Sequence, residues 1–162
     1  MSAERSVARI DLGAIRHNVG ALARAAQRAE LLVVVKANGY GHGAVPVAQA
    51  ALEAGASRLG LAAVAEVEEL RAGGIAAPML MWGPMIGDEW RRAAATGSEI
   101  AVWTPEGCAA AAQAGIGRIH LKLDSGMGRL GVRPEAVAAL IEAAADPRLT
   151  VAGVMTHFAT AD

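Results

Sequence analysis

A chain of 162 residues can hold one ordinary domain with its own core. Hydrophobic residues make up 54% of the chain and charged residues 19%, which excludes a disordered or fibrous protein. The formal net charge of -1 gives no electrostatic footprint for nucleic acid, and no apolar run approaches the roughly 20 residues of a membrane span. The amino terminus lacks the apolar segment of a signal peptide, and the single Cys108 excludes an internal disulfide. We therefore expect a soluble cytoplasmic protein in which Cys108 is a small buried hydrophobe.

Predicted strands and helices alternate along the chain. The first helix begins after an Asp11 cap, and its apolar face is expected to contain Ile15, Val19, Leu22 and Ala26. The expected strands are Leu31–Lys36, Leu59–Ala62, Met79–Trp82, Glu99–Trp103, Arg118–Leu123 and Thr150–His157. The expected later helices are Ala44–Ala54, Val64–Ala72, Asp88–Ala95, Pro105–Ala114 and Pro134–Ala145. Short connections between alternating strands and helices indicate a parallel sheet, either an open doubly wound sheet or a barrel.

The first expected strand ends on a lysine, Lys36, and a glycine-rich loop that contains Tyr40 follows it. A lysine is rarely buried without a partner or a function, and in a desolvated pocket its amine becomes a nucleophile able to form a Schiff base. The loop glycines let a backbone approach a ligand, and their free N–H groups suit a phosphate, to which the Tyr40 phenol could also donate. The pattern favours a phosphorylated carbonyl cofactor, pyridoxal 5'-phosphate (PLP). The alternative is a solvated loop lysine.

A second stretch with polar residues runs from Arg118 to Gly131. Alternation places its apolar residues on one face and His120, Lys122 and Asp124 on the other. In a barrel the apolar face would meet the helices and the polar face the lumen. Because buried charges need partners, the polar face indicates either a functional site or a structural ion-pair network.

A glycine pattern in the same stretch offers a competing interpretation. Gly126 to Gly131 fits G-x-G-x-x-G, the dinucleotide-binding fingerprint. The pattern follows the fifth expected strand and does not open a first βαβ unit, and Asp124 and Ser125 intervene after the strand. These features weigh against a dinucleotide site.

The candidate functional groups help to choose between the two kinds of sheet. Lys36, Trp82, the Asp124–Arg129 loop and His157 follow the carboxyl ends of different strands. Barrels draw their sites from many strand ends around a ring, whereas open sheets concentrate theirs at a switch point. The sequence therefore favours a TIM-type (β/α)8 barrel, here incomplete, with about six strands present. An exposed parallel edge strand is a liability, so residues 1–162 are expected to be the amino-terminal part of a longer protein.

Three stretches resemble alanine racemases. VVVKANGYGHG at residues 33–43 is similar to the PLP-lysine motif of that family, approximately AVVKANAYGHG, with Gly39 in place of the common alanine. HLKLDSGMGRLG at 120–131 resembles H-x-K-x-D-[ST]-G-M-G-R-x-G, and MTHFATAD at 155–162 resembles M-x-H-F-A-x-A-D. The resemblance covers nearly the whole chain and also implies the (β/α)8 barrel.

The resemblance implies roles for individual residues. Lys36 would hold PLP covalently and act as one of two catalytic bases, taking the α-proton of the D-enantiomer. Arg129 would lie beside the phenolic oxygen of the cofactor and bind the substrate carboxylate, for which a guanidinium is well suited. Lys122 matches the lysine that many relatives carbamylate to hold this arginine, and His157 would pack against the pyridine ring. Trp82 matches the family only loosely, and we expect it to pack in the core and not to form part of the pocket wall.

The implied function is the PLP-dependent interconversion of L-alanine and D-alanine, by an isomerase that acts as a homodimer and supplies D-alanine for bacterial peptidoglycan. In the family the second base is a tyrosine from a carboxyl-terminal β domain of the partner, so residues 1–162 alone are expected to bind PLP weakly and to be inactive. The alternatives are a broad-specificity amino-acid racemase, a decarboxylase relative, a non-catalytic PLP-binding barrel and a structural fragment without a cofactor.

Two smaller expectations concern side chains away from these motifs. His17, His42 and His120 do not have metal-ligand spacing, so no metal site is predicted. The helix at Val64–Ala72 is expected to present a solvated face made of Glu66, Glu68, Glu69 and Arg71.

Overall fold

Six parallel strands form one sheet in chain order in the computed structural model, which describes residues 6–161. They are β1 (Leu32–Val34), β2 (Arg58–Leu61), β3 (Met79–Met81), β4 (Glu99–Val102), β5 (Arg118–Leu123) and β6 (Thr150–Thr156). Each strand pairs in parallel with the strand next to it in the chain, so β1 and β6 form the two edges. An order without a reversal is that of a barrel wall and excludes the doubly wound alternative.

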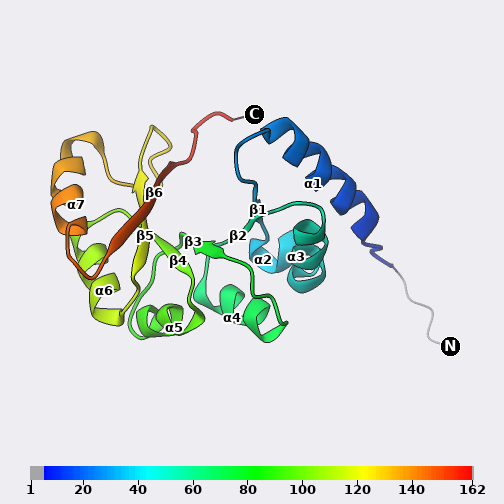
Figure 1. The fold of residues 1–162 in the computed structure, drawn as a ribbon, viewed down its shortest axis with the longest axis horizontal. Helices are drawn as coiled ribbons and strands as arrows, with labels where there is room; N and C mark the ends of the chain where they lie inside the picture. Colours follow the sequence, from blue (N-terminus) through cyan, green and yellow to red (C-terminus); the bar gives the residue numbers. More distant parts are fainter. Residues whose placement is uncertain (1–5, 162) are drawn as a thin grey trace.

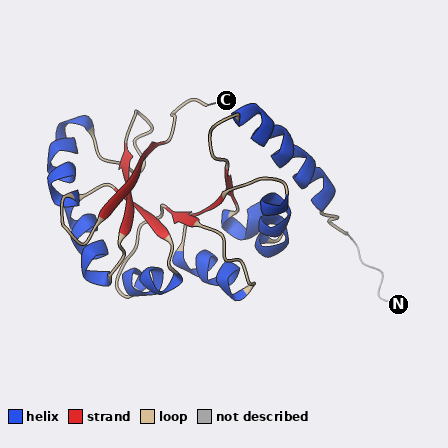
Figure 2. Cartoon of the chain, in the orientation of Figure 1, coloured by secondary structure: helices blue, strands red, loops and turns tan. Residues whose placement is uncertain are grey.

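Helices cover the outer face of the curved sheet (Figures 1 and 2). They are α1 (Leu12–Ala26), α3 (Ala44–Glu53), α4 (Val64–Ala72), α5 (Glu89–Thr96), α6 (Pro105–Ala114), the short 3-10 helix η1 (Pro134–Ala136) and α7 (Val137–Ala144). The short element α2 (Lys36–Tyr40) between β1 and α3 has left-handed backbone angles inside it and is a turn, not a regular helix. Figure 1 shows α3 to α7 following one another along the outside of the sheet, with α1 beside α3. Within residues 6–161 none of these helices has the length and apolar character needed to span a membrane.

The core lies between the sheet and the helices. Alternate residues of the strands point into it, and the largest that are fully buried include Leu59, Leu61, Met79, Met81, Ile100 and Ile119. Cys108 on α6 is fully buried among them, and burial raises the pKa of its thiol. The prediction that Cys108 is a small buried hydrophobe is confirmed.

Most predicted elements are present within two residues of their predicted bounds, and three differences have physical causes. The first strand ends at Val34, not at Lys36, because the backbone turns after Val35. The last predicted helix divides into η1 and α7. Leu22 is 57% exposed, so its place on the buried face of α1 was wrong, and α1 instead buries Val19.

The predicted cap of α1 is confirmed. The Asp11 carboxylate accepts hydrogen bonds from the backbone N–H groups of Gly13 at 2.8 Å and Ala14 at 3.1 Å. These bonds satisfy donors that the first turn of a helix would otherwise leave without an acceptor.

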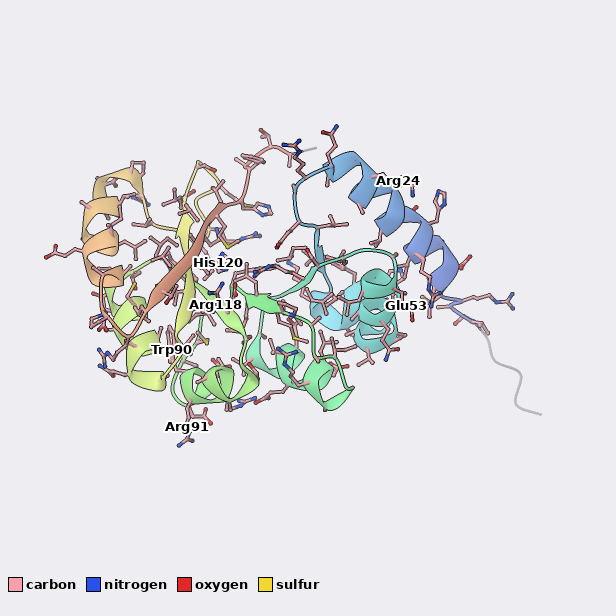
Figure 3. All side chains as sticks on the ribbon, viewed as in Figure 1. Arg24, Glu53, Trp90, Arg91, Arg118 and His120 are labelled. Carbon is pink, nitrogen blue, oxygen red and sulfur yellow. The ribbon has the colours of Figure 1, made fainter. Side chains whose placement is uncertain are left out.

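A charged cluster occupies the amino ends of the strands, on the face of the sheet opposite the helices. Glu99 of β4 is buried and accepts from Arg58 of β2 at 2.8 Å, and from Arg118 and His120 of β5 at 2.8 and 2.6 Å. Figure 3 labels Arg118 and His120, which lie near one another on β5. Burial alone would raise the pKa of Glu99, but hydrogen bonds from His120, Arg118 and Arg58 outweigh it and lower that pKa to about 2. His120, which sequence alternation placed on the polar face, therefore belongs to an ion-pair network that ties three strands together.

Candidate active site

Lys36 lies where β1 meets a left-handed turn. The residues Ala37, Asn38, Gly39 and Tyr40 have φ angles of 51°, 54°, 62° and 55°. For L-residues other than glycine this conformation costs roughly 1–2 kcal/mol each, and it usually occurs at single positions. Gly41 follows with a φ of 81°, so five consecutive residues are left-handed here, and neighbouring groups must stabilise the turn.

Backbone hydrogen bonds close this turn. Gly39 N–H donates to the carbonyl of Val35 and Gly41 N–H to that of Ala37, both at 2.9 Å. Gly43 N–H donates to the Asn38 carbonyl at 2.9 Å, while the Asn38 side chain accepts from Ala44 N–H at the start of α3 at 2.8 Å. The expectation that the loop glycines offer free N–H groups to a phosphate was wrong, because the turn itself uses the N–H groups of all three glycines.

A cavity of about 410 Å³ opens at the carboxyl ends of the strands, beside this turn. Its polar lining consists of Lys36, Tyr40, Lys122, Arg129 and His157, and its apolar lining includes Leu32, Val34, Leu80, Trp82 and Met155. The five residues that the sequence singled out therefore lie around one space, although they come from segments up to 121 residues apart.

The two lysines of the chain, Lys36 and Lys122, both line this cavity. Lys36 is half-buried, and its Nζ lies 5.9 Å from the centroid of the Tyr40 ring, within the range of a cation–π contact. Tyr40 is 57% exposed, so its phenol is open to solvent. A count of lysines alone would have shown that no other position of the chain offers a side-chain amine.

Lys122 is 7% exposed, and its Nζ donates to the backbone carbonyl of Leu130 at 2.6 Å. Burial lowers the pKa of Lys122, the cationic Arg129 lowers it further, and Asp124 partly opposes them. A lysine with a lowered pKa is more often neutral, and a neutral amine is nucleophilic.

The loop that carries Arg129 is closed at its base. Asp124 N–H donates to the Val132 carbonyl and Val132 N–H donates to the Lys122 carbonyl, both at 2.9 Å. The Asp124 carboxylate accepts from the N–H groups of Gly128 and Gly126, both at 3.0 Å, and these bonds lower its pKa. This internal bonding holds the loop so that Arg129 lines the cavity.

The same loop rules out the competing dinucleotide interpretation. After Gly131 the chain forms an isolated bridge at Val132, and the next helical residues begin only at Pro134. Gly126, Gly128 and Gly131 all have positive φ angles and do not open a helix. The strand–turn–helix arrangement that the fingerprint needs is therefore missing from these residues.

Trp82 follows the last residue of β3 and lines the cavity. A side chain at Gly60 on β2 would place its Cβ 2.5 Å from both Trp82 and Leu32, so glycine at this position makes room for the indole. Trp82 lines the cavity together with Leu32 and Leu80, and the preference for core packing over a place in the pocket wall was wrong. His157 follows β6, is exposed and completes the rim.

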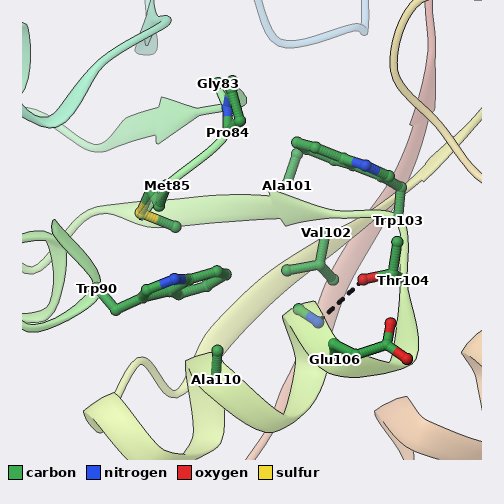
Figure 4. A pocket seen from close by; sticks show the side chains of 11 residues that line it. Gly83, Pro84, Met85, Trp90, Ala101, Val102, Trp103, Thr104, Glu106 and Ala110 are labelled. Carbon is green, nitrogen blue, oxygen red and sulfur yellow. Dashed lines mark hydrogen bonds between the residues drawn. The ribbon is translucent and has the colours of Figure 1, made fainter. Parts of the chain in front are cut away.

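A second cavity, of about 330 Å³, lies beyond the end of β4 between Trp90 and α6 (Figure 4). The indoles of Trp90 and Trp103 border it, and Thr104 caps α6 by accepting from Gly107 N–H at 3.1 Å. Glu106 is the one ionisable side chain among its lining residues. Because no amine lines it, this cavity lacks the chemistry that the first one offers.

The predicted solvated face of α4 needs correction at two residues. Arg71 donates to the backbone carbonyls of Ile75, Ala77 and Thr96 at 2.7 to 3.0 Å. Glu66 accepts three backbone hydrogen bonds, one of them from the turn after Lys36. Glu69 is exposed as expected. The signal that could have found Glu66 is its place at the third position of a helix, from which a glutamate often accepts at the helix start.

These features define a class of protein, a (β/α)8-type barrel with a lysine-centred cavity at the carboxyl ends of its strands. Residues 10–162 match the family model "Alanine racemase, N-terminal domain", and the chain belongs to this family.

Relatives and solved structures agree with this assignment. The chain is 46% identical to the alanine racemase of Symbiobacterium thermophilum, with 96% of this chain and 43% of the relative covered. It is 47% identical to that of Thermobifida fusca, again with 96% of this chain and 44% of the relative covered. The alanine racemase structure from D-cycloserine-producing Streptomyces lavendulae matches with a TM-score of 0.86 and 46% identity, over 94% of this chain and 42% of that chain. The chain thus spans less than half the length of these relatives, and the six-stranded sheet is part of the barrel that they share.

Proposed function

We propose that residues 1–162 are the amino-terminal barrel portion of a PLP-dependent alanine racemase that interconverts L-alanine and D-alanine. The observation that carries this proposal is the placement of both lysines of the chain on one cavity, together with Arg129 and His157. The family assignment of residues 10–162 supports the reaction type.

The residues of the cavity fit PLP. A volume of about 410 Å³ lies within the range of small-molecule sites. Leu32, Leu80 and Trp82 offer apolar surface for a flat ring, and the half-buried amine of Lys36 is placed to attack a carbonyl. When bound, PLP supplies an electron sink that acidifies the α-carbon of an amino acid.

The side chains would then divide the work as follows. Lys36 would hold the cofactor and, when free, take the α-proton of the D-enantiomer. Arg129 would pair with the substrate carboxylate, because a guanidinium can bind both of its oxygens. His157 would pack against the ring of the cofactor, and Tyr40 would contact its phosphate from the rim.

Lys122 is proposed to be carbamylated, which would place an anion beside Arg129 in place of a second cation. Carbon dioxide reacts with a neutral amine, and the pKa of Lys122 is lowered chiefly by burial and then by Arg129. We expect a carbamate carbon signal when the protein is equilibrated with 13C-bicarbonate and observed by NMR at pH 8. The signal of the Lys122 carbamate should be absent from Lys122→Arg, in which only the carbamate of the amino terminus remains, and unchanged in Lys36→Arg. The proposal would be contradicted if the unmodified protein lacked this signal, or if the same signal were present in Lys122→Arg.

The missing parts of the barrel and the second base are proposed to lie outside residues 1–162. Val151 and Val154 of the edge strand β6 are 43% and 63% exposed, which suits a strand that further elements cover. In the family the second base comes from a carboxyl-terminal β domain of the partner subunit, so a homodimer in the cytoplasm is proposed for the whole protein.

Racemase assays on two proteins test this function. Residues 1–162 with added PLP are expected to show no conversion of L-alanine, whereas the product of the whole gene is expected to form D-alanine. Appreciable turnover by residues 1–162 would refute the proposal that catalysis needs groups outside these residues. If the product of the whole gene does not racemise alanine, the assignment as an alanine racemase is refuted. A panel of other L-amino acids in the same assay would reveal a broad-specificity racemase.

A further inference from the structure

The carboxylate of Glu66 joins two segments of the backbone, the turn after Lys36 and the connection between β2 and α4. Its Oε1 accepts from Ala37 N–H in the turn after Lys36 at 2.7 Å. Its Oε2 accepts from Ala62 N–H at the end of β2 at 2.8 Å, and from Ala63 N–H at the start of α4 at 3.1 Å. Glu66 lies 29 residues from Ala37 in the chain, so the contact depends on the packing of α4 beside α2 and β2.

The bond to Ala37 acts on the peptide unit that Lys36 and Ala37 share. A peptide unit is planar, so holding its N–H in one direction restricts the ψ angle of Lys36 and the φ angle of Ala37 together. Ala37 has a φ of 51°, which an alanine rarely adopts without support. Within the described residues, the acceptor of the Ala37 N–H is the Glu66 carboxylate.

We propose that Glu66 is a positioning residue for Lys36, because its carboxylate holds the left-handed turn that presents the Lys36 amine to the cavity. The proposal rests on the function proposed above, in which Lys36 is the residue that reacts with the cofactor. Glu66 acts on Lys36 through the backbone and does not line the cavity.

The simpler alternative is that Glu66 only caps α4. The residue at the cap position is Ala63, whose side chain has no acceptor, and Glu66 accepts from its N–H in place of a conventional cap. Ala63 has φ -135° and ψ 151°, the extended geometry that a capping aspartate adopts. An Ala63→Asp change can therefore restore the cap without supplying an acceptor for Ala37.

Three variants separate the two roles. Glu66→Gln keeps the size of the side chain but leaves one oxygen, which cannot serve the donors on both sides of the carboxylate. Ala63→Asp with Glu66→Ala keeps a helix cap and removes the acceptor of Ala37. Glu69→Gln is the matched control, because Glu69 is on the same helix, is exposed and makes no side-chain hydrogen bond with the described residues.

Two measurements are made on each variant. Hydrogen exchange of the Ala37 amide is followed by NMR without cofactor, and the rate at which PLP with cyanoborohydride labels Lys36 is followed by peptide mass mapping. We expect Glu66→Gln and the double variant to speed Ala37 exchange and to slow Lys36 labelling, each by at least about tenfold, as the loss of a hydrogen bond to a charged acceptor implies. Glu69→Gln should behave as the unmodified protein.

Recovery of both rates in the double variant, or unchanged Lys36 labelling in Glu66→Gln, would overturn the positioning role. If the unmodified protein is not labelled at Lys36, the proposed function fails, and Ala37 exchange still decides whether Glu66 holds the turn.

Discussion

In the product of the whole gene, Lys36→Ala is expected to weaken the binding of PLP by at least about 100-fold, equivalent to about 2.7 kcal/mol. The reason is that the variant removes the amine proposed to link the cofactor covalently, and Lys36 is one of only two lysines that line the cavity. The free energy of unfolding should change by less than about 1 kcal/mol, because Lys36 is half-buried and its ring contact with Tyr40 at 5.9 Å is weak. The ratio of cofactor to protein after gel filtration, with the visible spectrum of the protein, measures the effect.

Lys36→Arg provides the matched control for charge. The guanidinium keeps a cation near the Tyr40 ring but is not a nucleophile at neutral pH, so it should lose PLP as Lys36→Ala does. Retention of the cofactor by both variants would show that Lys36 is not the attachment point.

Glu99→Gln is expected to lower the free energy of unfolding at pH 7 by roughly 3 kcal/mol, the value that corresponds to a carboxyl pKa displaced from 4.5 to about 2. Glu99 is buried and accepts from Arg58, Arg118 and His120, and an amide cannot balance the charges of the two arginines. Denaturant titration of the variant and of Glu142→Gln, a matched change at an exposed residue of α7, measures the difference. The Glu142 variant should lose little stability.

The pH dependence of the Glu99 effect has a definite sign. The pKa of Glu99 is lowered in the folded state, so its stabilisation is fully present above about pH 4.5 and declines as the pH falls from 4.5 towards 2. The difference between the unmodified protein and Glu99→Gln should therefore shrink over this window. A difference that stays constant from pH 7 to pH 3 would contradict the lowered pKa.

Sequence patterns predicted much of the fold because the elements carry strong local signals. β5 and the helices α4 and α6 have the predicted bounds, since strict alternation and proline or glycine at helix ends mark them. The barrel was predicted because the candidate functional residues follow the carboxyl ends of several different strands. Leu22 failed because helical spacing alone cannot tell which of two neighbouring stripes faces the sheet.

The turn after Lys36 shows what sequence patterns could not predict. Nothing about an alanine or a tyrosine favours a left-handed backbone, and Ala37 and Tyr40 adopt it in a setting that includes Asn38 bonded to α3 and Glu66 reaching from α4. Those contacts span 6 and 29 residues of the chain. They also explain why two predictions were wrong. The loop glycines were expected to have free N–H groups, and Glu66 was expected to be solvated.

Borohydride reduction of the protein with PLP, followed by peptide mass mapping, tests the central claim most directly. The chain has two lysines, Lys36 and Lys122, so the outcome is easy to assign. Our account predicts a pyridoxyl adduct on Lys36 alone, with Lys122 unlabelled even though it lines the same cavity. An adduct on Lys122, or labelling shared between the two lysines and the amino terminus, would contradict a site organised around Lys36.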